Sequence, residues 1–387
     1  MTTMPGSDSS LQVLQDASLK PYTTFKIGGP ARYLCTVTTP EQVRQATALA
    51  RAQSLPIFVL GGGSNILVSD AGFRGSVIHP MRTGIEIVEG EAGPQAGSAG
   101  VRLRVAAGEP WDRTVAFTVE RGCWGVENLS HIPGQSGAAL VQNIGAYGQQ
   151  LGDVFEQAEV LRMSDGGLQG LAAADCGLSY RRSIFNGTRR GEFLIWSITL
   201  NLGTKPLPQL NYRDVRAYFA ECGKREPSQR EIRQAIIEIR DRKFPFPREE
   251  RGGNAGSFFK NPTLDPAAWQ SLATRIEARF GEAGKTRLAD LRRRLNIARS
   301  APAAPMNVPA AFLIDLCGLK GFETGRAQVN PSQPLVILNQ GGATADDVLR
   351  VAGHVRTTVR RETGVVLELE PELVGFTPED LRRYLDL

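Results

Sequence analysis

Apolar residues near the C-terminus recur at the spacing of an amphipathic helix. Between residues 344 and 362 one face of the pattern is apolar and consists of Val348, Ala352, Val355 and Val359. A period of three to four positions is typical of a helix that packs one side against a core. Another helical region is expected from Asp265 onwards, where apolar positions run to Phe280 and resume after a glycine break.

Two capping boxes mark the starts of other helices. Residues 39–42 (TPEQ) and 228–231 (SQRE) each combine an N-cap hydroxyl with a Gln or Glu three positions later. The first helix is expected to run to about residue 53. The second has to end before the proline at position 245, so it places Lys243 at its C-terminal end, where a cation suits the helix dipole.

Residues 75 to about 202 are rich in β-branched and aromatic residues, which predicts a series of strands. The expected strands are 76–81, 85–90, 101–108, 158–163 and 193–202, with one helix over 109–122. Residues 92–100 (AGPQAGSAG) are expected to form a hairpin tip. A short helix over 310–318 and a strand over 335–339 complete a mixed α/β (α+β) pattern.

The last predicted strand, residues 365–375, carries three glutamates. Its apolar residues alternate with Glu368, Glu370 and Glu372, so the three carboxylates share one face at spacings of roughly 7 Å. Such a face can point to solvent, and Pro371 favours an edge strand or a strand end. Strand ends also place catalytic groups, and periodicity leaves these three interpretations open.

A glycine-rich loop separates two short apolar runs near the N-terminus. Residues 55–60 (LPIFVL) end in Gly61, Gly62, Gly63, Ser64 and Asn65, and the chain continues as a second β-rich run, residues 66–70. A dinucleotide-binding fingerprint requires its glycines to open a helix, so this loop is not one. Either it is a plain turn, or its bare N–H groups form an anion-binding nest.

Residues 131–153 (HIPGQSGAALVQNIGAYGQQLGD) are poor in large side chains. The glycines and alanines favour a backbone that lies against something flat or bulky. The alternative is a helix N-terminus that packs closely on a sheet.

Composition narrows the class of protein. A length of 387 residues predicts two or three domains. The net charge is +5, but acidic and basic residues are interleaved, so the sequence lacks the long basic stripe of a nucleic-acid binder.

Five scattered cysteines and three histidines show no metal-ligand spacing, so no metal site is expected and the cysteines are expected to be reduced core residues. No apolar run of eighteen residues and no signal-like N-terminus occur, which predicts a cytoplasmic protein without membrane contact.

Ser257 lies in residues 253–262 (GNAGSFFKNP), and its hydroxyl requires a partner or a task. The nucleophile elbow G-x-S-x-G is absent there, and none of His79, His131 and His354 is well placed for a hydrolase relay. A serine can instead donate a proton to a developing carbanion if a cation or helix N-terminus stabilises the alkoxide.

Several motifs, taken in order along the chain, resemble the UDP-N-acetylenolpyruvoylglucosamine reductase family. They are YTTFKIGGPARYL (22–34), VLGGGSNILVSD (59–70), IPGQSGAALVQNIGAYG (132–148), YRRSIFN (180–186), GNAGSFFKNP (253–262), AAFLIDLCGLKG (310–321) and LEPEL (369–373). The resemblance implies a two-subdomain FAD-binding fold of the vanillyl-alcohol-oxidase type with an inserted α+β substrate-binding domain. Its parts would be residues 1–82 and 83–243 for FAD, 244–363 for substrate, and 364–387 returning to the FAD-binding part.

The resemblance also implies the chemistry. Bound, non-covalent FAD would be reduced by NADPH and would then reduce UDP-N-acetylglucosamine enolpyruvate in peptidoglycan synthesis. Ser257 would protonate the intermediate, and Arg181 and Glu372 would stabilise its carboxylate. Tyr212, Lys243 and Asn261 would hold the UDP part. FAD would be bound by Gly61, Gly62, Gly63, Ser64, Asn65, Pro133, Gly134, Gly137, Asn143, Gly145, Ala146 and Tyr147. A monomer without nucleic-acid partners is expected.

The chain departs from the family pattern in two places. Leu373 and Val374 follow Glu372 where an arginine is usual, and the region 264–308 is longer than usual. Two alternatives remain from the sequence: a related FAD-dependent sugar or lactone oxidoreductase, and a nucleotide-binding protein without catalysis. The set of Ser257, Lys243, Asn261 and Glu372 argues against the first, and a protein that stays colourless after FAD is added would favour the second.

Overall fold

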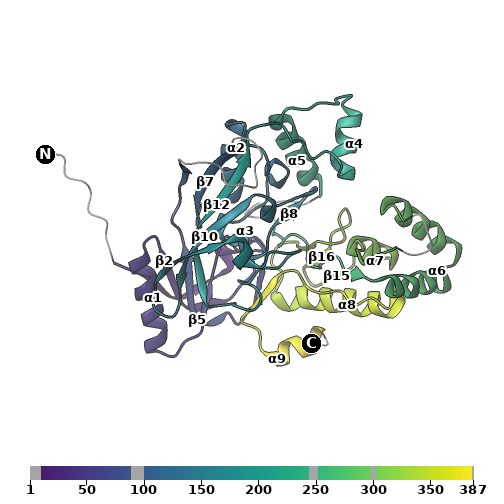
Figure 1. Ribbon diagram of the computed structural model, residues 1–387. Coiled ribbons are helices and arrows are strands. Elements are labelled where there is room, and N and C mark those ends of the chain that lie inside the picture. The colour runs from purple at the N-terminus through teal and green to yellow at the C-terminus, as the bar shows by residue number, and fades with distance from the viewer. Residues whose placement is uncertain (1–9, 89–99, 244–251, 298–301, 386–387) are drawn as a thin grey trace. The chain divides into compact units, whose positions relative to one another are not determined.

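The computed structural model describes residues 10–88, 100–243, 252–297 and 302–385 (Figure 1). The chain divides into two compact units that interleave in sequence. Unit 1 is Met1–Ala17, Pro30–Gly63 and Phe73–Arg242, and unit 2 is Ser18–Gly29, Ser64–Gly72 and Lys243–Leu387. The four-part division predicted from the sequence stays a prediction.

The helices and strands follow one another in a mixed order. The α-helices are α1 (Pro40–Ala52), α2 (Trp111–Glu120), α3 (Ser136–Val141), α4 (Arg213–Glu221), α5 (Gln229–Lys243), α6 (Pro266–Arg294), α7 (Ala310–Leu316), α8 (Ala345–Thr363) and α9 (Pro378–Leu385). The strands up to residue 150 are β1 (Gln12–Ser18), β2 (Pro30–Val37), β3 (Ile57–Val59), β4 (Ile66–Val68), β5 (Phe73–Pro80), β6 (Ile85–Val88), β7 (Gly100–Ala106), β8 (Gly145–Ala146) and β9 (Gln149–Gln150). The later strands are β10 (Phe155–Arg162), β11 (Leu168–Ala172), β12 (Phe193–Gly203), β13 (Thr263–Leu264), β14 (Met306–Asn307), β15 (Glu323–Thr324), β16 (Ala327–Val329), β17 (Ile337–Asn339) and β18 (Glu372–Val374).

Unit 1 contains two main sheets. The first has the order β1-β2-β5-β3, in which β5 pairs in parallel with both β2 and β3. The second is antiparallel, with the order β11-β10-β12-β7-β6. The near-continuous burial of β12 fits its central place in that sheet, because both of its faces are covered. Trp111 and Val115 of α2 join the core of this second sheet.

A smaller core of unit 1 surrounds α4 and α5. Val215 and Phe219 of α4 pack with Ile232 and Ile236 of α5, and the same cluster includes Tyr147. This core matters for the site because it fixes the end of the 131–148 segment against two helices.

Unit 2 is built around α8 and the small antiparallel sheet β15-β16-β17 (Figure 1). Its core draws on Phe25, Ile27 and Leu67, which come from two short N-terminal segments of the chain. Those segments are more than 200 residues away in sequence from α8, so unit 2 cannot be completed by the C-terminal part of the chain alone. Strand β4 of the second segment pairs in parallel with β18.

Most predicted elements are confirmed within one to three residues. The predicted capping boxes at Thr39 and Ser228 form, and α6 has its expected break at Gly281, whose φ of 56° is left-handed. Gly100 begins β7, and the rest of the predicted hairpin tip, residues 92–99, lies outside the described residues. None of the helices in the described part of the chain combines the length and apolar character that a membrane crossing needs.

Two predictions are wrong in detail. The last strand is not continuous over 365–375, because the segment changes partner at Pro371: Glu370 donates its N–H to Phe258, whereas β18 pairs with β4. A proline has no N–H for a ladder, so the change of partner falls where a bond is missing in any case. The cysteines are not all core residues, since Cys222 is exposed and Cys317 half-buried, although all five are free.

Candidate functional site

The glycine-rich loop that follows β3 touches the 131–148 segment backbone to backbone. A Cβ placed on Gly61 would lie 2.6 Å from the Cβ of Ala138, and one placed on Gly62 would lie 2.5 Å from the Cα of Gly134. Both distances are shorter than real Cβ contacts, so only glycine allows the two loops to approach this closely. These four residues belong to unit 1.

The start of α3 packs tightly on the second sheet. Gly137 donates its N–H to Ala107 over 2.9 Å, and a Cβ on Gly137 would lie 2.7 Å from that of Ala107. The alternative interpretation of these glycines, a helix N-terminus packed closely on a sheet, is therefore confirmed. It does not conflict with flavin binding, since the same segment also contacts Gly62 through Gly134.

The site fits a flavin dinucleotide. Within the described residues, the N–H groups of Gly61 and Gly62 donate no hydrogen bond to another part of the chain. Bare N–H groups in a turn without side chains form a concavity suited to a pyrophosphate. Gly134, Gly145 and Ala146 continue this small-residue surface along the same segment, where an extended cofactor can lie close to the backbone.

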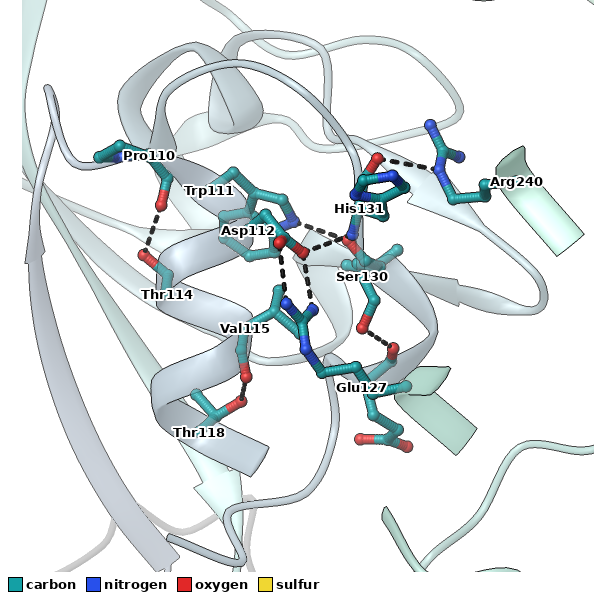
Figure 2. Close-up of polar contacts among 12 residues, drawn as sticks. Pro110, Trp111, Asp112, Thr114, Val115, Thr118, Glu127, Ser130, His131 and Arg240 are labelled. Atoms are coloured by element: carbon teal, nitrogen blue, oxygen red, sulfur yellow. Dashed lines mark hydrogen bonds and ion pairs between the residues drawn. The ribbon is translucent and has the colours of Figure 1, made fainter. Parts of the chain in front are cut away.

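Figure 2 shows how the beginning of the 131–148 segment is held. His131 has a left-handed backbone with φ of 60°, which is uncommon outside glycine. Its N–H donates to Oδ1 of Asp112 over 2.5 Å, and its carbonyl accepts from Nε of Arg240 over 3.0 Å. Its ring Nε2 lies 3.0 Å from Oδ1 of Asp241. Contacts from α2 and α5 therefore fix the conformation one residue before Ile132 and Pro133.

Asp112 is itself part of an ion pair. Both of its oxygens accept from Arg233 of α5, at 2.6 and 2.8 Å. Burial raises the pKa of the Asp112 carboxyl, but hydrogen bonds from Arg233 and from the N–H of His131 outweigh burial and hold the pKa below its ordinary value. No local sequence pattern marks this pair, because its partners lie 121 residues apart.

Arg240 and Tyr147 connect the 131–148 segment to Tyr212, a predicted substrate residue of unit 1. Arg240 is buried, with 9% of the residue exposed, and its side chain approaches the Tyr147 hydroxyl. Burial raises the pKa of that hydroxyl to about 12, and the Arg240 charge opposes only part of the rise. The Tyr147 ring stands edge-on to the ring of Tyr212, with 5.2 Å between centroids. Tyr212, which precedes α4, is 46% exposed and so can meet a ligand.

Arg181 lies beside the same segment. Its Nη2 donates to the carbonyl of Gly145 over 3.0 Å, and its guanidinium lies 5.3 Å from the centre of the Tyr180 ring. The backbone of Arg181 is left-handed, with φ of 56°. Unit 1 thus brings Arg181, Gly145, Tyr147 and Tyr212 together.

Ser257 and Glu372 both lie in unit 2, just beyond one end of a short antiparallel pairing. Phe258 accepts the N–H of Glu370 and Lys260 donates to Glu368, so Ser257 lies one residue and Glu372 two residues past the last bonded pair. On the other side, Ser257 pairs with Val336.

Asn65, the last residue of the glycine-rich loop, forms hydrogen bonds with the segment that carries Glu370 and Glu372. Its side chain donates to the carbonyl of Glu370 over 3.1 Å, and its own carbonyl accepts from the N–H of Glu372 over 3.0 Å. Asn65 and Ser64 therefore belong to unit 2, whereas Gly61, Gly62 and Gly63 belong to unit 1.

Burial separates the three glutamates of the last strand. The Glu368 side chain is 67% exposed and lies 3.4 Å from Nζ of Lys260, as expected of a solvated carboxylate. Glu370 and Glu372 are half-buried. The question that periodicity left open is thus answered for Glu368, which faces solvent.

Two predicted substrate residues have structural contacts of their own. The side chain of Asn261 accepts from the N–H of Ala310 at the start of α7 over 2.9 Å. Lys243 is the last residue of α5, as predicted, and its carbonyl accepts from Asn330 over 3.1 Å. Their roles toward a ligand stay predictions.

Comparisons with known proteins agree with this arrangement. Residues 31–171 match a family model for an FAD binding domain, and residues 247–374 match one for the C-terminal domain of UDP-N-acetylenolpyruvoylglucosamine reductase. The chain is 37% identical over 362 residues to the protein of that name from Shewanella sp. (strain ANA-3), covering 94% of this chain and 97% of the relative. The Pseudomonas aeruginosa protein of that name is 39% identical over 364 residues, covering 94% and 99%.

A solved structure is similar as well. The crystal structure of UDP-N-acetylenolpyruvylglucosamine reductase from Thermus caldophilus aligns with a TM-score of 0.60 and 25% identity, covering 94% of this chain and 99% of that one. The extent of these matches confirms the resemblance and the fold class inferred from the motifs. The close contact between the glycine-rich loop after β3 and the 131–148 segment agrees with both. The chain belongs to the UDP-N-acetylenolpyruvoylglucosamine reductase family of FAD-dependent oxidoreductases.

Proposed function

We propose that this protein reduces UDP-N-acetylglucosamine enolpyruvate to UDP-N-acetylmuramate, with NADPH as the reductant, for peptidoglycan synthesis. Family membership supports the reaction class and the UDP-sugar substrate. The observation that supports the mechanism is the pairing of Phe258 with Glu370 in unit 2, because Ser257 lies one residue and Glu372 two residues beyond that pair.

The chemistry divides between cofactor and protein. FAD, when bound, takes a hydride from NADPH and supplies it to the vinyl carbon of the substrate. Negative charge then develops on the adjacent carbon and on the substrate carboxylate, and Ser257 gives its hydroxyl proton to that carbon. General acid catalysis of this kind contributes about 10²- to 10⁴-fold in rate.

Arg181 and Glu372 would act on the substrate carboxylate. A guanidinium forms strong, charge-assisted hydrogen bonds with carboxylate oxygens, and Arg181 is held by the carbonyl of Gly145 so that part of its fork is already oriented. Glu372 is half-buried and fixed by the pairing of β18 with β4. Its carboxylate can accept the O–H of the enol form.

The UDP part would be held by Tyr212, Lys243 and Asn261. The exposed ring of Tyr212 offers a surface for the ligand, and its edge-on contact with Tyr147 limits how the ring can turn. Lys243 at the end of α5 provides a point charge for the pyrophosphate. The side-chain N–H₂ of Asn261 can donate to the ligand while its oxygen accepts from Ala310.

The direct test is a coupled assay on the FAD-loaded protein. NADPH oxidation should begin when UDP-N-acetylglucosamine enolpyruvate is added, and mass spectrometry should show a product heavier by two hydrogens. UDP-N-acetylglucosamine, which lacks the enolpyruvyl group, is the matched control and should give no reduced product. NADPH oxidation that is equally fast with both compounds, without the reduced product, would contradict the proposal.

A further inference from the structure

We propose that Thr24, a residue of the N-terminal segment Ser18–Gly29, is a positioning residue that orients Ser257 through Asn254. This inference rests on the proposed role of Ser257 as proton donor. Thr24 is 233 positions from Ser257 in sequence, yet both belong to unit 2. None of the roles proposed for the reaction uses a residue of the motif at 22–34, which contains Thr24.

Thr24 forms two hydrogen bonds with the backbone of Asn254. The Thr24 hydroxyl donates to the Asn254 carbonyl over 2.7 Å, and the Asn254 N–H donates to the Thr24 carbonyl over 3.2 Å. The two chains are so close that a Cβ on Gly253 would lie 1.9 Å from the Thr24 carbonyl oxygen. The glycine before Asn254 is therefore required by the contact with Thr24.

Asn254 in turn fixes the backbone that leads to Ser257. Its side chain is buried, with the residue 7% exposed, and its Oδ1 accepts from the N–H of Gly256 over 2.9 Å. Gly256 is left-handed, with φ of 71°. The turn from Asn254 to Gly256 sets the direction in which the Ser257 side chain leaves the backbone, because Ser257 follows directly.

Neighbouring contacts make the support rigid. Gly253 and Asn339 exchange two backbone hydrogen bonds, and the Asn339 side chain donates to the carbonyl of Phe25 over 2.9 Å. The Phe25 ring packs edge-on to that of Phe258, with 6.2 Å between centroids. The residues on both sides of Ser257 are thus connected to the segment that carries Thr24.

The hydroxyl of Thr24 can be removed without disturbing that framework. Thr24→Val keeps the side-chain shape and the backbone hydrogen bond, and it leaves the Asn254 carbonyl without its hydroxyl donor. A displacement of about 1 Å at a catalytic group can cost about 100-fold in rate. We therefore expect reoxidation of the reduced flavin by the enolpyruvyl substrate to slow by about 10- to 100-fold, while reduction by NADPH stays within about threefold of the wild-type rate.

Stopped-flow measurements of both half-reactions test the idea on four variants. Thr24→Ser retains the hydroxyl and should restore most of the reoxidation rate. Thr363→Val is the matched control, since the buried Thr363 hydroxyl of α8 also donates to a backbone carbonyl, that of Val359, over 2.7 Å. It should lower stability without changing either half-reaction. Ser257→Ala gives the rate expected when the proton donor is missing.

The outcomes separate the two proposals. Normal reoxidation in Ser257→Ala would overturn the proton-donor role itself. Slow reoxidation in Ser257→Ala with normal reoxidation in Thr24→Val would overturn the role of Thr24 alone. Equal slowing of both half-reactions in Thr24→Val, or impairment of Thr24→Ser as large as that of Thr24→Val, would also overturn it. If Thr24→Val does not fold, Thr24→Ala, which also lacks the hydroxyl, takes its place, and normal reoxidation in Thr24→Ala would overturn the role of Thr24.

Discussion

Replacing Gly62 with alanine tests whether the contact between the two glycine-rich loops supports flavin binding. A Cβ at this position lies 2.5 Å from the Cα of Gly134 and 3.0 Å from its carbonyl carbon, whereas ordinary contact begins at 3.4 Å. The loops therefore have to separate by about 0.9 Å, and both sides of the contact are backbone, so no flexible side chain can yield. Overpacking of this kind costs about 1 to 3 kcal/mol.

If FAD lies along both loops, this cost appears as weaker FAD binding. Because about 1.4 kcal/mol corresponds to a factor of ten, the dissociation constant should rise about 5- to 150-fold. Quenching of flavin fluorescence during titration of the FAD-free protein measures it directly.

The matched control is Gly170→Ala in β11. A Cβ at Gly170 meets nothing within 4 Å, and the position lies in the same unit. This variant should bind FAD as the wild type does. Binding by Gly62→Ala within a factor of two of the wild type, at unchanged stability, would refute the argument from the loop contact.

Three further predictions concern stability. The pKa of Asp112 is lower in the folded protein than the 3.8 of the unfolded chain, so its ion pair stabilises the fold above pH 3.8. This stability is lost as pH falls through the lower, folded-state pKa. Urea titrations should therefore show that Asp112→Asn loses less stability than the wild type between about pH 5 and pH 3. Arg240→Met removes the donor to the His131 carbonyl and should lower the free energy of unfolding by about 1 to 3 kcal/mol, whereas an unchanged urea midpoint would contradict the buried contact. A Cβ on Gly353 of α8 would lie 2.1 Å from the carbonyl oxygen of Tyr384 in α9. Gly353→Ala should therefore release α9 from α8 and speed digestion by carboxypeptidase. Equal digestion rates for the variant and the wild type would contradict this prediction.

Local signals made much of the fold predictable. Capping boxes at Thr39 and Ser228 and the 3.6-residue period of α8 are encoded within a few neighbouring residues, and the structure matches them. The continuous strand expected over 365–375 failed because pairing partners are not encoded locally. Nothing in the alternation shows that the segment pairs with residues near Phe258 before Pro371 and with β4 after it.

The site was predictable where it depends on motifs and not where it depends on distant partners. The motifs named Ser257, Arg181 and Glu372, and the structure places Ser257 and Glu372 in the same unit, just beyond the pairing of Phe258 with Glu370. The supports Asp112 and Arg240 contact residues more than 100 positions away and have no local signature. Their roles follow only from the folded arrangement.

Single-turnover reoxidation of Ser257→Ala tests the central claim most directly. The variant, loaded with FAD, is first reduced by NADPH and then mixed with UDP-N-acetylglucosamine enolpyruvate in a stopped-flow instrument. Ser332→Ala, at an exposed serine of the same unit, is the control. If Ser257 is the proton donor, reduction should stay near the wild-type rate while reoxidation slows by at least about 100-fold. Reoxidation of Ser257→Ala at the rate of the control would contradict the mechanism.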